Sequence, residues 1–361
     1  MQNFTQKVRY NYLDIAKGIG ILMVIWGHVL YYHWSGQYVY TFHMPLFFFL
    51  SGMLFQRNKY PSFSSFFVKR SRRLLIPYSI YSICTWFLWV FFQYKTNNLP
   101  DNWLSSLFQT LWAQGSGEFM PHNSPLWFIP CLFAVEILYF YTSSFSDRVN
   151  VCLCLLLALA SICLERVFGE TYLLLLPWNF DAALMAIPFY AAGNLLLKHI
   201  SHQTIVDRIK KFWIAAISFV ICSSVIIYYS LEMYGSISLG HSHYGNEIIF
   251  HTRAFMCCLS VLITAVILDV LKKYLGKLFS LLIDVFIWFG RMSLDVMCTH
   301  VPIKGIAVLA VAILFHVTSK EVTHSFYLSI IVYSSVVLVD AFVVWMIDKA
   351  KIRYNSNYGK F

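Results

Sequence analysis

Long apolar stretches alternate with short polar breaks along nearly the whole chain. Each stretch is close to the roughly 20 residues that an α-helix needs to cross the hydrocarbon core of a bilayer. The pattern predicts about ten membrane-spanning helices. They are expected at residues 15–32, 38–55, 74–93, 125–142, 150–166, 181–197, 212–231, 248–271, 293–315 and 326–347. We therefore expect an all-α, polytopic integral membrane protein in which residues 1–361 form a single membrane-embedded domain.

Composition supports the membrane assignment. Hydrophobic residues make up 59% of the chain and charged residues only 12%, and the mean hydropathy is +0.63. Such values exclude an ordinary soluble domain. The first apolar stretch carries Lys17 and His28 and ends without a small-residue cleavage site, so we expect a retained helix and not a removable signal peptide.

The formal net charge of +10 is best explained by membrane topology. Clusters of Lys and Arg fall in alternate breaks, which is typical of cytoplasmic loops. This distribution predicts an even number of spans with both termini in the cytoplasm. It favours contacts with membrane lipid and argues against a nucleic-acid partner. The interrupted segment 278–292 has two open placements, either along the inner interface or at the start of the ninth span.

Candidate chemistry begins in the first span. Lys17 and His28 are eleven positions apart, which returns them to nearly one face of a helix about 16 Å apart along its axis. Ionisable side chains at membrane depth are costly and typically line a functional cavity. Asp14 can pair with Lys17 and reduce that cost. Alternatively, Lys17 extends to the interface and His28 bonds a neighbouring helix, so both interpretations stay open.

Two further segments carry polar groups of interest. The second span opens with His43 and a proline, and Pro and Gly can open a helix where it faces a cavity. The following break, KRSRRLLIPY, concentrates basic side chains that would attract lipid headgroups or a phosphate-bearing ligand. Neither source of negative charge is preferred by the sequence.

Other motifs point away from metal and cofactor chemistry. The nine Cys residues lie mostly within apolar spans and lack metal-finger spacing. The HSH stretch at 241–243 has no clear third ligand, so an exposed loop is the better interpretation. The motifs of soluble hydrolases, nucleotide-binding loops and zinc proteases do not occur. We expect no metal site and no bound cofactor.

Five segments together resemble a known family. They are YLDIAKGIGILMVIWGH, FHMPLFFFLSGMLF, KRSRRLLIPY, PLWFIPCLF and GRMSLDVMCTH, in this order along the chain. Their combination resembles the acyltransferase-3 family of integral-membrane acyltransferases, and within it the branch similar to fucose 4-O-acetylases. The resemblance covers nearly the whole chain.

The resemblance implies transfer of an acyl group, usually acetyl from acetyl-CoA. The acceptor would be a hydroxyl of a cell-surface polysaccharide or its lipid-linked precursor, and the location the bacterial inner membrane. The family's basic residue and histidine match Lys17 and His28, although the basic residue is more often Arg. The other matching positions are Arg70, Arg73, Trp127, Phe128, Ser293 and His300.

These matches suggest roles for each group. Histidine has a near-neutral pKa, so His28 is the candidate general base or the residue that first accepts the acyl group. The expected catalytic set is His28, Lys17 and Asp14, and the expected donor-binding set is Arg70, Arg73, Ser293 and His300. The expected acceptor-binding set is His43, Trp127, Glu247, His251 and Arg253. For His43, His300, Trp127 and the Glu247–His251 pair, a packing or interfacial role is the open alternative.

A transporter or flippase of a lipid-linked saccharide is the competing hypothesis, because it too would place polar residues at membrane depth. The sequence lacks evident inverted repeats and concentrates acid–base groups around one helix, which favours the enzyme. The acceptor, the acyl chain length and the oligomeric state are left open.

Overall fold

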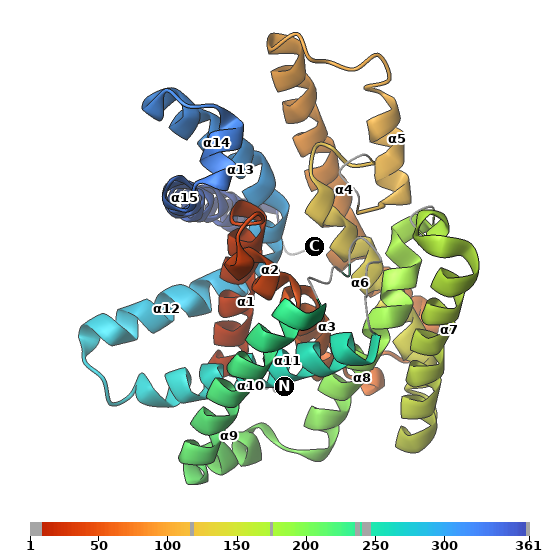
Figure 1. Cartoon of the computed structure of the whole chain (residues 1–361). Coiled ribbons are helices and arrows are strands. Elements are labelled where there is room, and N and C mark those ends of the chain that lie inside the picture. Colours follow the sequence, from red (N-terminus) through yellow and green to blue (C-terminus); the bar gives the residue numbers. More distant parts are fainter. Residues whose placement is uncertain (1–8, 116–118, 174–175, 235–238, 240–246, 359–361) are drawn as a thin grey trace.

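All regular elements in the described part of the chain are helices, as Figure 1 shows. The computed structural model describes residues 9–115, 119–173, 176–234, 239 and 247–358. The first seven α-helices are α1 (Asn11–Val29), α2 (Trp34–Tyr40), α3 (His43–Leu54), α4 (Phe63–Lys95), α5 (Ser105–Trp112), α6 (Phe128–Thr142) and α7 (Asp147–Leu173). The others are α8 (Phe180–His199), α9 (His202–Lys211), α10 (Trp213–Tyr234), α11 (Glu247–Leu271), α12 (Lys277–Arg291), α13 (Ser293–Phe315), α14 (Ser319–His324) and α15 (Phe326–Tyr358). Short 3₁₀ turns occupy η1 (Arg57–Lys59), η2 (Ser124–Trp127) and η3 (Pro177–Asn179).

Nine helical segments of the described residues are long and apolar enough to cross a membrane. They comprise α1, α4, α6, α7, α8, α10, α11, α13 and α15, some with an adjoining 3₁₀ turn. Nine of the ten predicted spans are therefore continuous helices. The all-α, polytopic membrane class predicted from the apolar pattern is confirmed.

The remaining predicted span, residues 38–55, is a broken helix. The chain leaves helical geometry at Phe42, with φ −139° and ψ −19°, and α3 begins at His43. Pro45 lies in the first turn of α3, where its missing N–H is tolerated. Apolar periodicity could not locate this break, because apolar side chains continue on both sides of it.

The segment that the sequence left open, 278–292, forms most of the separate helix α12. This helix packs closely on α1 through two glycines. A Cβ atom at Gly18 would collide with the backbone carbonyl of Phe286, and a Cβ atom at Gly290 would collide with that of Asp14. The end of α12 is thereby fixed against the Asp14 end of α1.

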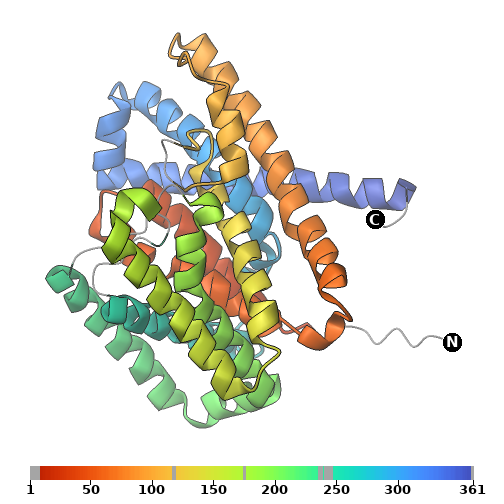
Figure 2. The ribbon, with the colours of Figure 1, turned by 90° about the vertical axis from the view of Figure 1, so that its right-hand side faces the viewer.

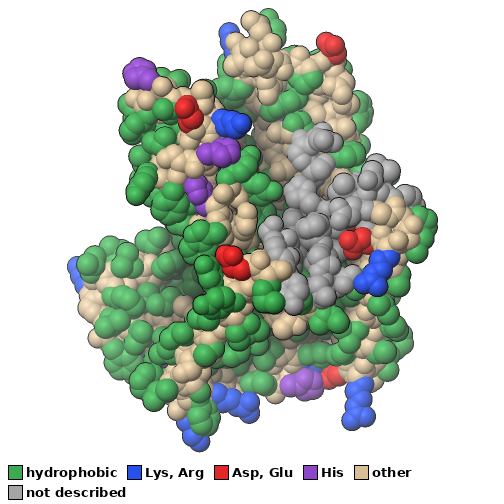
Figure 3. All heavy atoms as spheres, in the orientation of Figure 1, with side chains coloured by type: hydrophobic (Ala, Val, Ile, Leu, Met, Phe, Trp, Pro, Cys, Tyr) green, Lys and Arg blue, Asp and Glu red, His purple; other side chains and the backbone are tan. Residues whose placement is uncertain are grey.

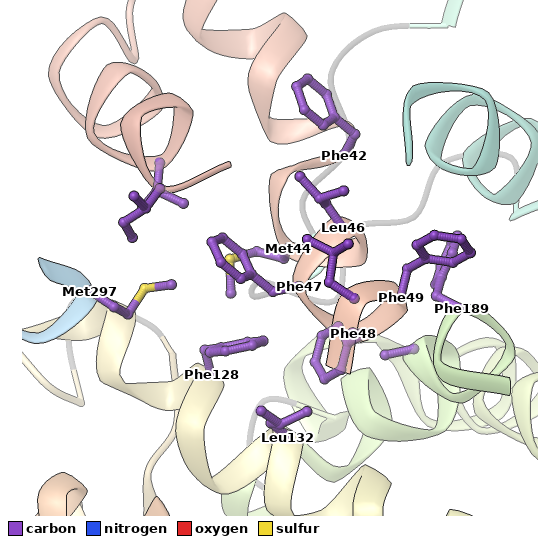
Figure 4. Close-up of a cluster of buried hydrophobic side chains, with 14 of the residues drawn as sticks. Phe42, Met44, Leu46, Phe47, Phe48, Phe49, Phe128, Leu132, Phe189 and Met297 are labelled. Atoms are coloured by element: carbon purple, nitrogen blue, oxygen red, sulfur yellow. The ribbon is translucent and has the colours of Figure 1, made fainter. Parts of the chain in front are cut away.

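Helix α3 lies at the centre of the apolar core. Figure 4 shows its aromatic side chains directed toward several neighbouring helices. Phe47 and Phe48 contact Phe128 of α6, with ring centroids 6.0 and 5.1 Å apart. Because α3 is buried on nearly all sides, the residues at its first turn are held rigidly.

The outer surface is mostly hydrophobic, as expected for contact with lipid. Figure 3 shows Lys and Arg side chains gathered along the lower edge of one face. Figure 2 shows the carboxyl-terminal part of α15 extending beyond the neighbouring helices. We use the term basic end for the end of the bundle that holds Arg9, Asp14 and Arg291.

Candidate active site

Three histidines from three helices meet at the last turn of α1. The ring centroid of His28 on α1 lies 5.2 Å from that of His300 on α13 and 6.5 Å from that of His43 on α3. His43 and His300 are buried, at 3% and 0% exposure. The Tyr40 hydroxyl lies 3.1 Å from Nδ1 of His28. The sequence assigned these histidines to three different roles, and the structure brings them into one cluster.

Helix backbone fixes the orientation of two of these rings. Nδ1 of His43 lies 2.8 Å from the carbonyl oxygen of Val39, and Nδ1 of His300 lies 3.0 Å from that of Val296. A carbonyl oxygen only accepts hydrogen bonds, so each Nδ1 carries the proton and each Nε2 keeps its lone pair in the neutral ring. Nε2 of His300 has no hydrogen-bond partner among the described residues. This nitrogen is therefore available as a base or a hydrogen-bond acceptor.

A small cavity adjoins the cluster. It has a volume of about 40 Å³, and its lining includes His28, Tyr40, His43, Trp127 and Met297. This is room for a few water molecules, which is enough for a reacting hydroxyl group. Trp127 is 6% exposed and lies in this lining, so it belongs to the site region and not to the lipid-facing surface.

The segment before Trp127 is anchored to α13. The Asn123 side-chain amide donates to the carbonyl of Cys298 at 2.7 Å. The neighbouring His122 is 4% exposed, and neither ring nitrogen has a hydrogen-bond partner among the described residues. Burial lowers the pKa of His122 to about 4, so this ring is neutral at physiological pH. A histidine in the polar stretch before PLWF was visible in the sequence, but its burial was not.

At the other end of α1, Asp14 is bound by arginines and not by Lys17. The Asp14 carboxylate accepts from Arg9 at 2.6 and 3.1 Å and approaches Arg291 at 3.5 Å. Lys17 makes no ion pair within 4 Å in the described residues, but the charges of Asp14, Arg73 and Arg9 act on it. The expected Asp14–Lys17 pair is replaced by a larger basic group around one carboxylate.

Asp14 and Lys17 are not brought to His28. All three lie on one continuous helix, and eleven residues of helix separate Lys17 from His28 by about 16 Å along the axis. The expected catalytic set is therefore divided between the two ends of α1. The histidine cluster lies at one end and the basic group at the other.

The expected donor-binding residues lie between the basic end and the histidine cluster or near the basic end. Ser293 starts α13 next to the basic end, and His300 follows seven residues later on the same face of the helix. Arg73 is exposed near the basic end, within electrostatic reach of Lys17. Arg70 instead forms a bidentate ion pair with Glu136 of α6, a carboxylate at 0% exposure.

Two other expected acceptor-binding residues, His251 and Arg253, are not among the described residues that line the cavity. His251 lies 3.2 Å from the carbonyl of Met185 and its ring stacks on Phe189 at 5.2 Å. Arg253 is buried and donates to the hydroxyl and the carbonyl of Ser230 on α10. Glu247 begins α11, but its side chain, like the loop 241–243, lies outside the described residues. An acceptor role for these residues stays a prediction.

Sequence reasoning missed four polar residues at the site. Tyr40 bonds His28, Arg291 approaches Asp14, and Glu136 neutralises Arg70. The fourth, Lys304, donates to the carbonyl of His28 at 3.3 Å. Lys304 could have been found, since a lysine near the middle of an apolar span and one turn after a histidine is uncommon.

Comparison with known proteins supplies the class of chemistry. Residues 10–346 match the acyltransferase-3 family, described as an acyltransferase domain. No curated protein and no solved structure matches the chain. The match spans α1 through most of α15 and includes every residue of the histidine cluster. The chain therefore belongs to the acyltransferase-3 family of membrane acyltransferases.

Proposed function

We propose that this protein is a membrane O-acetyltransferase that moves acetyl from acetyl-CoA to a hydroxyl of a cell-surface polysaccharide or its lipid-linked precursor. The observation that carries the proposal is the cluster of His28, His43 and His300, beside a cavity lined by His28 and His43, in a chain of the acyltransferase-3 family. Acyl transfer to a sugar hydroxyl needs a base near neutral pKa, and imidazole supplies one.

In the direct route, His28 takes the proton from the acceptor hydroxyl as its oxygen attacks the acetyl carbonyl. The tetrahedral intermediate collapses, the carbon–sulfur bond breaks, and the CoA thiolate leaves and receives that proton. In the relay route, an imidazole nitrogen of His28 attacks the acetyl carbonyl first, the carbon–sulfur bond breaks, and CoA leaves as its thiol with the proton that the acylated ring gives up. The acceptor hydroxyl then attacks the acyl-imidazole and restores the free histidine. Both routes place His28 next to the reacting groups, at the acceptor hydroxyl in the first and at the acetyl carbon in the second.

The basic end is the proposed entry for the donor. Arg73 and Lys17 offer positive charge to the CoA phosphates, with Arg70 already paired to Glu136. Ser293 and His300 then follow along α13 toward His28, so the thioester end of the donor would extend along this face. Asp14 holds Arg9 and Arg291 in place and takes no part at the reacting carbon.

On the acceptor side, Trp127 lines the cavity and offers an aromatic face to a sugar ring, and His43 lies beside His28. We place the protein in a bacterial inner membrane with both termini in the cytoplasm, so that the basic end meets cytoplasmic acetyl-CoA. A lipid-linked saccharide transporter is not favoured by the family match.

The test is transfer of radiolabelled acetyl from acetyl-CoA by purified protein in liposomes, with an extract of lipid-linked and polymeric glycan. We expect label in glycan with wild type and about 10²- to 10⁴-fold less with His28→Ala. The matched control is His324→Ala, which removes an exposed histidine stacked on Tyr32 and should transfer normally.

Two outcomes would contradict the proposal. Normal transfer by a correctly inserted His28→Ala protein would remove His28 from its role. No label with wild type across several glycan extracts would reject acetyl-CoA or glycan as the substrate. Hydroxylamine-labile label on wild-type protein without acceptor, absent from His28→Ala, would select the relay route.

A further inference from the structure

Lys304 is an ionisable residue in contact with the histidine cluster that the proposed chemistry does not use. Its ammonium donates to the main-chain carbonyl of His28 across the interface between α13 and α1, with an Nζ–O distance of 3.3 Å. It lies four residues after His300, one turn further along α13. One helix thus presents an imidazole and a cation to the same turn of α1.

The position of Lys304 is costly for a lysine. Helix α13 is 23 residues long and apolar enough to cross a membrane, and Lys304 lies near its middle. A cation at such a depth requires a polar partner, and the carbonyl of His28 is that partner. Extension of the side chain to an interface does not explain a lysine that is directed at a neighbouring helix.

The carbonyl that Lys304 contacts belongs to the last turn of α1, which ends at Val29. Carbonyl groups in the last turn of a helix have no intrahelical N–H partner, and the helix dipole favours a cation there. Lys304 therefore satisfies a backbone group that would otherwise be poorly paired, and it holds the turn that carries His28.

We propose that Lys304 is a positioning residue for acyl transfer. Its ammonium fastens the last turn of α1 to α13 and so keeps the imidazole of His28 beside that of His300. This role rests on the proposed function, in which His28 acts next to the reacting groups. Displacement of a catalytic group by about 1 Å is enough to lower a rate by about 10²-fold.

The experiment compares Lys304→Met, which removes the charge but keeps the chain length, with Lys304→Arg, which keeps both charge and reach. Lys320→Met is the matched control, because Lys320 is exposed on α14. Two quantities are measured in liposomes. The first is acetyl transfer, as separate kcat and KM values. The second is the rate at which diethyl pyrocarbonate modifies His28, followed by mass spectrometry of its peptide, which requires neither donor nor acceptor.

We expect Lys304→Met to lower kcat by about 10- to 100-fold with KM nearly unchanged. The modification rate of His28 should change several-fold, while that of the exposed His324 stays constant. Lys304→Arg should recover most of both quantities, and Lys320→Met should resemble wild type. Thermal unfolding of each variant identifies a general loss of fold.

An unchanged modification rate of His28 in a folded Lys304→Met protein would overturn the proposal. The proposal would also be overturned if Lys304→Met and Lys304→Arg lost kcat alike, with equal losses of thermal stability. That result would mean that Lys304 contributes to the stability of the fold and does not position His28. If wild type transfers no acetyl, the proposed function fails, and the modification rates still decide the positioning role.

Discussion

At the scale of single residues, we expect the ion pair between Arg70 and Glu136 to be important for the free energy of unfolding. Glu136 is fully buried between helices, and its carboxylate is neutralised by the Arg70 guanidinium from α4. Removing one partner of a buried pair leaves a charge without compensation and typically costs about 3–5 kcal/mol. We expect Glu136→Leu to lower the free energy of unfolding by about this amount, measured by denaturation in detergent.

The double variant Arg70→Met, Glu136→Leu is the control for this prediction. It removes both charges, so it should recover most of the stability that Glu136→Leu loses. Wild-type stability in Glu136→Leu alone would show that Arg70 reaches water or lipid phosphate without its partner.

The sequence predicted the spacing of polar residues within one helix well. Residues on one helix have a fixed spacing, so the separation of Lys17 and His28 followed from periodicity and agrees with a continuous α1. Contacts across helices could not be found in this way. Glu136 is 66 residues from Arg70, and no feature near the basic motif indicates that a buried carboxylate meets it.

At the scale of helices, two glycines allow α3 and α8 to approach closely. A Cβ atom at Gly52 would collide with the carbonyl of Tyr190, and a Cβ atom at Gly193 would collide with that of Phe49. Backbone atoms cannot move aside as flexible side chains do, so the helices must separate. We expect Gly52→Ala to lower the free energy of unfolding by about 1–3 kcal/mol, measured by thermal or chemical denaturation.

Gly305 provides the contrast within the same protein. A Cβ atom there meets nothing within 4 Å, so Gly305→Ala should be neutral or stabilise α13 by up to about 1 kcal/mol. Equal destabilisation by Gly305→Ala and Gly52→Ala would show that the close backbone contact at Gly52 is not the cause of the effect.

Among the ten predicted spans, the prediction was wrong where a span is interrupted. Apolar composition predicted nine continuous spans, but it also predicted a tenth, at 38–55, that is divided into α2 and α3. The break puts His43 in the first turn of α3, where its ring bonds Val39. The feature that periodicity could not detect is therefore the one that positions a histidine of the candidate site.

At the scale of the whole molecule, the broken segment decides the topology. Nine continuous spans alone would leave the two chain ends on opposite sides of the membrane. If α2 and α3 together make a tenth crossing, both ends lie on one side. The structure supports the second arrangement, because Arg9 and Lys351, near the two ends, bind Asp14 and Asp295. Arg291 joins Asp14 to the start of α13, which carries Asp295.

Reporter fusions test this arrangement and identify the side. Because Lys and Arg concentrate at the basic end, we expect both termini to be cytoplasmic. Alkaline phosphatase requires disulfides and is active only outside the cytoplasm, so a fusion at the carboxyl end should be inactive while a fluorescent-protein fusion there is bright. A phosphatase fusion after Tyr32, between α1 and α2, should be active, and one after Lys59, beyond α3, should be inactive. Activity after both Tyr32 and Lys59 would mean that α2 and α3 do not cross, and the donor and acceptor sides would then need to be assigned anew.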